Sequence, residues 1–441
     1  MTKENNQPKN YDLKILQLNC NGIKNKSTEL NLWLKENNIK IAAIQETKLT
    51  NKSKPPNFPN YTMIRKDRER DTGGGLAFLV HETIPFEPLP DVQLDKFTEY
   101  LAIKVDNIKI VNIYIPPASS CDIGFLPNLA TLFKDNNTII MGDFNAHDPL
   151  WFSPIQDARG TLVSDAIGAS SFGVLNMDMP TRTSRNSQPT SPDISLAGPP
   201  LLPYINWTTS PSLGSDHLPI VITCTTTLKL IMSENKTYIN FKKADWVNFT
   251  LTSEEEISKL NPPTDVCRAE QDFREVINRV SRNTIPQGRI KEIFPEIPTT
   301  AKNKILERDE LRKTNPQSPQ IPELNYEINK LINKHKQEKW REEVGNIDRK
   351  TDPSKLFNLL KRLNGQPQSK QNQGIRFKGK YLSTATNIAN NFNKQYTSVS
   401  RHTSSKLTRT IFKESQRNTT SGATILTTSD TGTAIKQAKS S

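Results

Sequence analysis

The chain has 441 residues, more than one ordinary domain holds, and its 59 Lys and Arg against 46 Asp and Glu give a net charge of +13. This positive excess predicts an anionic partner, with nucleic acid favoured over an acidic membrane. The sequence contains no run of about 18 apolar residues and begins with a polar segment, so we expect neither a membrane span nor a secretory signal.

The positive charge is concentrated in the second half of the chain. Residues 1–225 contain 21 Lys and Arg and 23 Asp and Glu, a net of −2, whereas residues 226–441 contain 38 and 23, a net of +15. Residues 366–441 alone contain 12 basic and two acidic residues among many Ser, Thr, Asn and Gln. We expect this tail to be flexible and to bind RNA or DNA, with a purely solvated segment as the alternative.

Strands are predicted throughout residues 11–225. The strands at 100–105 and 108–115 are predicted to form a hairpin that turns at Asp106-Asn107. Short apolar runs predict the strands at 13–18, 41–46, 75–80, 100–105, 108–115, 138–143 and 218–224.

Helices are predicted between these strands. One follows the first strand, where Leu30, Trp33 and Leu34 share a face, and others are expected at 123–134 and 161–171. The segment 178–200 is rich in Pro, Ser and Thr and predicts mostly loop. Strands alternating with helices indicate an α/β fold, with a two-sheet core and helices outside it.

The second half predicts a different organisation. Residues 322–345 form an amphipathic helix pattern, and residues 353–364 form another that starts after Asp352 and ends before Gly365. The apolar stripe of the first helix consists of Leu324, Ile328, Leu331, Ile332 and Trp340. We therefore divide the chain into a disordered N-terminus (1–10), an α/β domain (11–225), a helical linker (226–365) and a basic tail (366–441).

The cysteines give no sign of a disulfide framework or a zinc site. Cys20, Cys121, Cys224 and Cys267 are scattered and have neither Cys-x-x-Cys spacing nor a suitably spaced histidine. We expect reduced thiols in a nuclear or cytosolic protein.

Polar and acidic residues follow several predicted strands, the position at which α/β folds assemble their sites. Each motif also has an ordinary structural explanation: a solvated strand end for Glu46, an Asx turn for Asp143 with Asn145, and a cap for Asp216-His217. Their recurrence in order along the chain favours a shared site. The candidates are Asn19, Asn21, Glu46, Tyr114, Asp143, Asn145, Asp193, Asp216 and His217.

Such a set suits hydrolysis of a phosphodiester, which needs a metal ion, an activated water and hydrogen-bond donors to the phosphate. Glu46 with Asn21 or Asp216 offers the oxygen ligands that Mg²⁺ prefers, with Mn²⁺ as the alternative ion. Asp143 is placed to orient or deprotonate the water, and His217 is expected to be held by a second carboxylate, for which Asp193 is the candidate. The sequence has no GxxxxGK[ST] phosphate loop and no GxSxG nucleophile motif.

Five motifs in order resemble the endonuclease/exonuclease/phosphatase superfamily, which includes DNase-I-like and apurinic/apyrimidinic-site nucleases. Their wording is most similar to the endonuclease domain of jockey-type non-LTR retrotransposon polyproteins, over residues 11–225. The motifs are NCNG (19–22), QET (45–47), YIPP (114–117), GDFNAH (142–147) and SDHLPI (215–220).

The resemblance implies a four-layer α/β/β/α sandwich (DNase-I-like) that nicks double-stranded DNA with a metal ion. The nick would leave a 3′-OH that primes reverse transcription. Asn21 stands where repair nucleases usually carry Asp. The resemblance implies catalytic roles for Asn19, Tyr114, Asp143, Asn145, Asp193 and His217, and metal-binding roles for Glu46, Asn21 and Asp216.

Two arginines in the loop before Asp193, Arg182 and Arg185, are predicted to enter a DNA groove, with an exposed hairpin that does not touch DNA as the alternative. Residues 355–365 and 386–399 resemble the connector that precedes a reverse transcriptase. The chain contains no adjacent Asp-Asp pair, so we expect no polymerase activity in this truncated sequence.

Two other functions compete with the retrotransposon endonuclease. One is an apurinic/apyrimidinic repair nuclease or another phosphodiesterase of the same fold, against which the 216 residues after 225 argue. The other is a catalytically idle remnant that binds nucleic acid. For the leading interpretation we expect a DNA target, element RNA bound by the basic tail, and a nuclear location after cytoplasmic synthesis.

Overall fold

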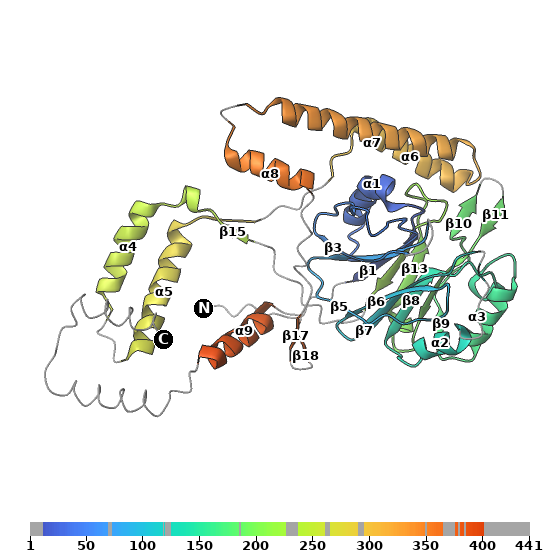
Figure 1. Ribbon diagram of the computed structural model, residues 1–441, viewed down its shortest axis with the longest axis horizontal. Coiled ribbons are helices and arrows are strands. Elements are labelled where there is room, and N and C mark those ends of the chain that lie inside the picture. The colour runs from blue at the N-terminus through green and yellow to red at the C-terminus, as the bar shows by residue number, and fades with distance from the viewer. Residues whose placement is uncertain are drawn as a thin grey trace, which may run out of the picture. The chain divides into compact units, whose positions relative to one another are not determined.

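Two six-stranded sheets with helices on their outer sides are built from the first half of the chain (Figure 1). The computed structural model describes residues 12–68, 73–117, 119, 125–184, 187–225, 237–260, 265–289, 295–348, 351–364, 375–377, 380–382 and 385–400.

Sheet 1 has the strand order β13-β14-β1-β2-β4-β3, in which only β1 and β2 pair in parallel. Every residue of β2 is buried, because the other sheet covers one face of the strand and helix α1 covers the other. The strands are β1 Leu13–Asn19, β2 Ile41–Gln45, β3 Tyr61–Lys66, β4 Leu76–His81, β13 Ile205–Thr209 and β14 Ile220–Cys224.

Sheet 2 has the order β5-β6-β7-β8-β12-β9, with β7 and β8 as its parallel pair. The hairpin predicted across Asp106-Asn107 is confirmed, since β6 and β7 pair antiparallel and Asp106 has a φ of 53°. The strands are β5 Glu87–Pro88, β6 Glu99–Val105, β7 Ile108–Tyr114, β8 Thr138–Asp143, β9 Gly173–Val174 and β12 Asp193–Ala197.

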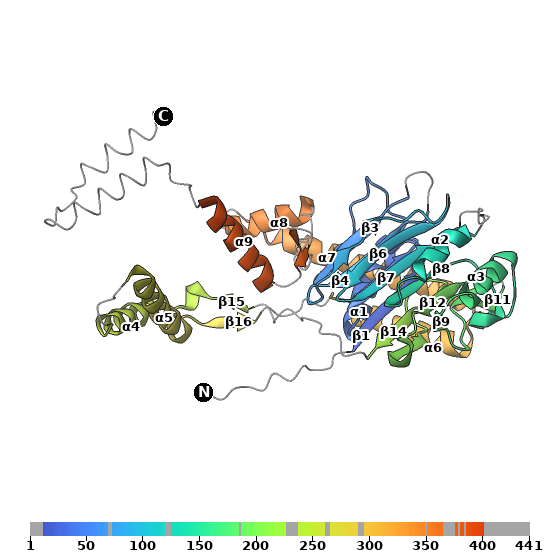
Figure 2. The ribbon, with the colours of Figure 1, turned by 90° about the horizontal axis from the view of Figure 1, so that it is seen from below.

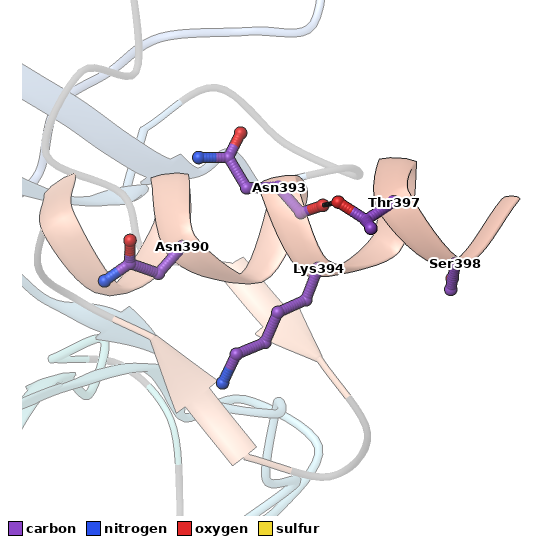
Figure 3. A pocket seen from close by; sticks show the side chains of 5 residues that line it. All are labelled: Asn390, Asn393, Lys394, Thr397 and Ser398. Carbon is purple, nitrogen blue, oxygen red and sulfur yellow. Dashed lines mark hydrogen bonds between the residues drawn. The ribbon is translucent and has the colours of Figure 1, made fainter. Parts of the chain in front are cut away.

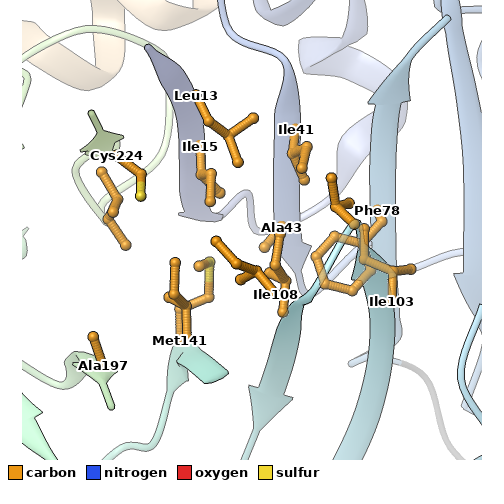
Figure 4. Close-up of a cluster of buried hydrophobic side chains, with 14 of the residues drawn as sticks. Leu13, Ile15, Ile41, Ala43, Phe78, Ile103, Ile108, Met141, Ala197 and Cys224 are labelled. Carbon is orange, nitrogen blue, oxygen red and sulfur yellow. The ribbon is translucent and has the colours of Figure 1, made fainter. Parts of the chain in front are cut away.

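Three apolar clusters hold the layers together. Between the sheets, Ile15, Ile41 and Phe78 of sheet 1 meet Ile103 and Met141 of sheet 2 (Figure 4). A second cluster packs α1 (Ile23–Glu36) on the outer face of sheet 1, and a third packs α2 (Phe125–Leu132) and α3 (Ala158–Gly168) on the outer face of sheet 2. The predicted four-layer α/β/β/α sandwich is therefore confirmed (Figure 2).

The prediction of loop at 178–200 was wrong in part. This segment contains β12 and the ribbon formed by β10 (Arg182–Ser184) and β11 (Ser187–Thr190). Strand β12 lies between β8 and β9 and is fully buried, so ladder hydrogen bonds and burial override the turn preference of its Asp and Ser residues. Helix α3 also begins earlier than predicted, where Asp157 caps Gly160.

Helices α4 to α7 follow the sandwich along the chain. They form two pairs, α4 (Trp246–Ser258) with α5 (Val266–Thr284) and α6 (Thr299–Thr314) with α7 (Gln320–Gly345). The stripe predicted for α7 is buried at Leu324, Ile328 and Ile332, whereas Trp340 is 37% exposed and stands outside it. The buried cluster to which α7 contributes extends along this helix as far as Ile332, eight positions before Trp340. None of the helices described has the length and apolarity to cross a bilayer.

A shorter helix and two ribbons also belong to the described part of this region. The predicted helix 353–364 is confirmed as α8 (Pro353–Asn364). Two-stranded ribbons are formed by β15 (Thr237–Ile239) with β16 (Gln287–Arg289), and by β17 (Ile375–Phe377) with β18 (Lys380–Leu382).

Residues 385–441 form a separate unit in which the described part is helix α9, Ala385–Ser400. A hollow of about 450 Å³ lies along this helix (Figure 3). All five lining side chains belong to α9 itself, so a single helix provides the only described wall. The hollow is therefore no candidate for a substrate site.

Candidate active site

Strand pairing gathers the predicted residues at one edge of the sandwich. In sheet 2, Asp143 lies opposite Tyr114 on one side and opposite Asp193 on the other. In sheet 1, Asn19 ends β1 beside Gln45 of the parallel strand β2, and Glu46 follows directly. The sheets are stacked, so these strand ends converge from both layers.

The floor of the site is the buried triad Asp143, Asp193 and His217. His217 Nδ1 lies 2.8 Å from Asp193 Oδ2, and His217 Nε2 faces Asp143 Oδ2 at 3.8 Å. Thr181, which the sequence analysis missed, donates from its hydroxyl to the same Asp193 oxygen at 2.7 Å. Asp193 thus holds the imidazole in a fixed orientation with its second nitrogen directed at Asp143.

Burial and mutual charge change the acidity of the triad. Burial, reinforced by the Asp193 carboxylate and opposed by His217, raises the pKa of Asp143 to about 7. Burial alone would lower the pKa of His217, but the carboxylates of Asp193 and Asp143 outweigh it and raise that pKa to about 9. The two carboxylates thus favour the protonated imidazole, and burial favours the protonated form of Asp143.

Asn19 connects the triad to the loop that follows β2. Its Nδ2 donates to Asp143 Oδ2 at 2.7 Å and to Glu46 Oε1 at 3.0 Å. Tyr114 donates from its hydroxyl to the same Glu46 oxygen at 3.0 Å. Burial and the Glu46 and Asp143 carboxylates raise the pKa of Tyr114, so its phenol stays protonated and is a permanent donor.

The rim of the site consists of Asn21, Glu46 and Asp216, the residues predicted to bind metal. Asn21 Nδ2 lies 3.4 Å from Asp216 Oδ1. The Lys48 ammonium lies 2.5 Å from Asn21 Oδ1 and 3.4 Å from Glu46 Oε2. Lys48 thus places a positive charge against oxygens of Asn21 and Glu46.

Several site residues have strained backbone conformations. Asn21, Glu46 and Asn145 have φ values of 45°, 49° and 45°, in the left-handed region that non-glycine residues rarely adopt. Each follows a strand, where the turn directs the side chain across the strand ends. Glu46 is the most unusual, because it lacks the local hydrogen bonding that favours Asn there.

Asn145 supports the site through loop contacts. Its backbone N–H donates to Asp143 Oδ1 at 3.0 Å, which is the Asx turn considered as the structural alternative for this motif. Its Nδ2 donates to the Ile115 carbonyl at 2.9 Å and so ties the β7 loop to the β8 loop. Arg159 of α3, also missed from the sequence, donates to the carbonyls of Phe144 and Asn145.

Of the two arginines predicted to bind DNA, only Arg182 lies among the described residues. Arg182 stands at the start of β10 and its Nε donates to Asp216 Oδ2 at 3.0 Å, so it borders the rim. Arg185 lies outside the described residues.

Two groups of side chains could bind a metal. Ligand atoms of Asp143, Asp193 and His217 all lie within 4.8 Å of one another. The rim provides the second group, and its side chains are more accessible: Glu46 is 19% and Asp216 31% exposed. In the triad, Asp193 and His217 already satisfy each other.

In comparisons with known proteins, residues 108–221 match the family model described as Endonuclease-reverse transcriptase. The chain is 24% identical over 288 residues to the RNA-directed DNA polymerase from mobile element jockey of Drosophila melanogaster, covering 63% of this chain and 31% of that protein. It is 24% identical over 312 residues to the probable RNA-directed DNA polymerase from transposon BS of the same organism, covering 67% and 33%. The chain thus spans about a third of the curated relatives it matches.

Two solved structures are similar to about half of the chain. The endonuclease domain of TRAS1, a telomere-specific non-LTR retrotransposon, matches at 21% identity and a TM-score of 0.42, covering 49% of this chain and all of that one. An AP endonuclease from Archaeoglobus fulgidus matches at 20% identity and a TM-score of 0.41, covering 48% of this chain and all of that one.

Proposed function

We propose that this chain, which carries an endonuclease–reverse transcriptase-type domain related to the jockey and BS proteins, is a metal-dependent DNA endonuclease of a non-LTR retrotransposon. It would nick target DNA and leave a 3′-OH to prime reverse transcription. The observation that carries the proposal is the continuous series of contacts from Asp193 through His217, Asp143 and Asn19 to Glu46.

The reaction is hydrolysis of a phosphodiester. A water oxygen attacks the phosphorus, the bond from phosphorus to O3′ breaks, and O3′ takes up a proton. Asp143, with a pKa of about 7, is suited to hold the attacking water and accept its proton near neutral pH. His217 presents Nε2–H to a phosphate oxygen while Asp193 fixes the ring, and Asn19 and Tyr114 act as neutral donors.

The metal would be Mg²⁺, with Mn²⁺ as the alternative, held by Glu46, Asn21 and Asp216. When bound, the ion supplies positive charge against the charge that develops on the phosphate and the leaving oxygen. Lys48 must give up its contacts with Glu46 and Asn21 for the ion to enter.

The substrate in this proposal is double-stranded DNA. Arg182 at the rim would contact the DNA backbone or groove, and the basic tail would hold element RNA. We propose a nuclear location for the reaction, after synthesis in the cytoplasm.

The test is nicking of supercoiled plasmid with Mg²⁺ by the wild type and by the variants Asp143→Ala and His217→Ala. Asp165→Asn, on the exposed outer side of α3, is the matched control for loss of an acid. We expect nicking by the wild type and the control alone, with ends that a DNA polymerase extends without repair. Equal nicking by all four proteins would refute the proposed chemistry.

The competing functions predict different outcomes in the same assay. A repair nuclease would cut a duplex with an abasic site and leave intact plasmid almost untouched. An idle remnant would bind DNA in a salt-sensitive manner and nick neither substrate.

A further inference from the structure

The hairpin of α6 and α7 packs directly on the domain that carries the site. Leu32 of α1 shares an apolar cluster with Ala301 of α6 and with Ile328 and Ile332 of α7. Next to this cluster Arg308 of α6, whose side chain is fully buried, pairs with Glu29 of α1 at 2.6 Å. A buried arginine needs such a partner, so this contact specifies how α6 lies against α1.

One turn further along α6, Arg312 binds the loop that precedes Asp216 and His217. Its Nη1 donates to the carbonyls of Pro211, Ser212 and Leu213, at 3.2, 3.2 and 2.6 Å. Its Nη2 donates to the Ser215 carbonyl at 2.5 Å. Arg312 as a whole is only 6% exposed, so these contacts form away from water, where hydrogen bonds from a charged donor are strong.

The loop held by Arg312 connects to both halves of the site. Ser215 donates from its hydroxyl to the Asn19 carbonyl at 2.7 Å and accepts from the His217 N–H at 3.3 Å. Leu213 has a φ of 65°, a conformation that a leucine adopts only when its surroundings enforce it. The Leu213 carbonyl accepts the shortest of the three hydrogen bonds from Arg312 Nη1.

We propose that Arg312 is a positioning residue for phosphodiester cleavage, because it fixes the 211–215 loop and thereby the location of His217 and Asp216 relative to Asn19. The inference rests on the proposed function and makes the α6–α7 hairpin a working part of the nuclease. Arginine suits this task because its planar fork reaches several carbonyls at once, whereas a lysine offers one compact ammonium.

The test uses the full chain with Arg312→Gln and Arg312→Lys. Ile328→Ala is the matched control, because it weakens the packing of the hairpin without removing a contact to the loop. We expect kcat for nicking to fall about 100-fold in Arg312→Gln, as displacement of catalytic groups by about 1 Å does, with KM for DNA within about twofold of wild type. Arg312→Lys should restore part of the loss, and Ile328→Ala should lower Tm and leave kcat unchanged.

Hydrogen exchange of the peptide covering residues 210–218 gives a readout that is independent of activity. Exchange should accelerate in Arg312→Gln and stay at the wild-type rate in Ile328→Ala. Wild-type kcat with wild-type exchange in both Arg312 variants would overturn the proposal, and so would losses in Ile328→Ala equal to those in Arg312→Lys. If the wild type does not nick DNA, the proposed function fails, and the exchange rates alone decide whether Arg312 orders the loop.

Discussion

The buried triad and the rim of the site both gather carboxylates, but they hold charge in different ways. Asp143 and Asp193 lie in the interior, and their carboxylates raise the pKa of the neighbouring His217. Glu46 and Asp216 are partly exposed and are paired with side-chain cations, Lys48 and Arg182. In the proposed function this difference corresponds to a division of labour, with proton transfer and orientation at the buried triad and exchangeable cation binding at the rim.

The largest effect should come from Asp143→Asn. The amide keeps the shape of the side chain but cannot accept a proton from water, so we expect nicking to slow by about 10³-fold, within the range found for loss of a general base. Measuring kcat under DNA saturation separates this loss from any change in binding. A fall of less than tenfold would remove Asp143 from the chemistry.

A smaller effect is expected from Glu46→Gln, which removes a charged ligand and leaves the triad in place. We expect the Mg²⁺ concentration for half-maximal nicking to rise about tenfold to 100-fold, as weakened metal sites show. The control is Lys48→Met, which frees the Glu46 carboxylate and should leave the Mg²⁺ requirement unchanged or lower. An unchanged requirement in Glu46→Gln would shift the metal towards the triad.

The pH dependence of stability provides a third comparison. His217 has an ordinary pKa of 6.5 and a folded pKa of about 9, so the folded state binds its proton more tightly and stability falls as pH rises from 6.5 through 9. Burial raises the pKa of Asp143 from 3.8 to about 7, so this group also makes stability fall as the pH rises from about 4 to about 7. Between pH 7 and 9 we expect the Tm of the metal-free wild type to drop by about 5 °C more than that of His217→Asn. Parallel Tm curves would mean that His217 titrates normally.

The smallest effect is expected at Arg182, whose side chain is 40% exposed. Arg182→Gln should weaken DNA binding by about twofold to fivefold and reduce its salt dependence by about one phosphate contact. Its kcat should stay close to wild type. A large loss of kcat instead would mean that the contact with Asp216 positions the rim.

The sequence predicted the core of the fold because its strands are short apolar runs. β2 and β8 are buried along their whole length, and their runs IAAIQ and TIIMGD show this without a structure. β12 was missed, since DISLA reads as part of a Ser-rich loop and becomes a strand only by pairing with β8. Local composition carries no information about such a partner, which comes from elsewhere in the chain.

The site also contains residues that the sequence predicted and residues that it did not. Residues at strand ends, such as Asn19 and Asp143, are visible in the sequence because each follows a recognisable strand. Thr181 and Arg312 are not, because they act through tertiary contacts: Arg312 reaches the Ser215 carbonyl across 97 positions of sequence. Neither lies in a motif that spacing or composition distinguishes from ordinary surface residues.

An Mg²⁺ titration of nicking by Asp143→Asn and Glu46→Gln in parallel decides whether the metal binds at the rim while the buried triad handles the proton. We expect high Mg²⁺ to restore much of the activity of Glu46→Gln and none of the activity of Asp143→Asn. Rescue of Asp143→Asn by Mg²⁺, with no rescue of Glu46→Gln, would contradict this expectation and place the metal among Asp143, Asp193 and His217.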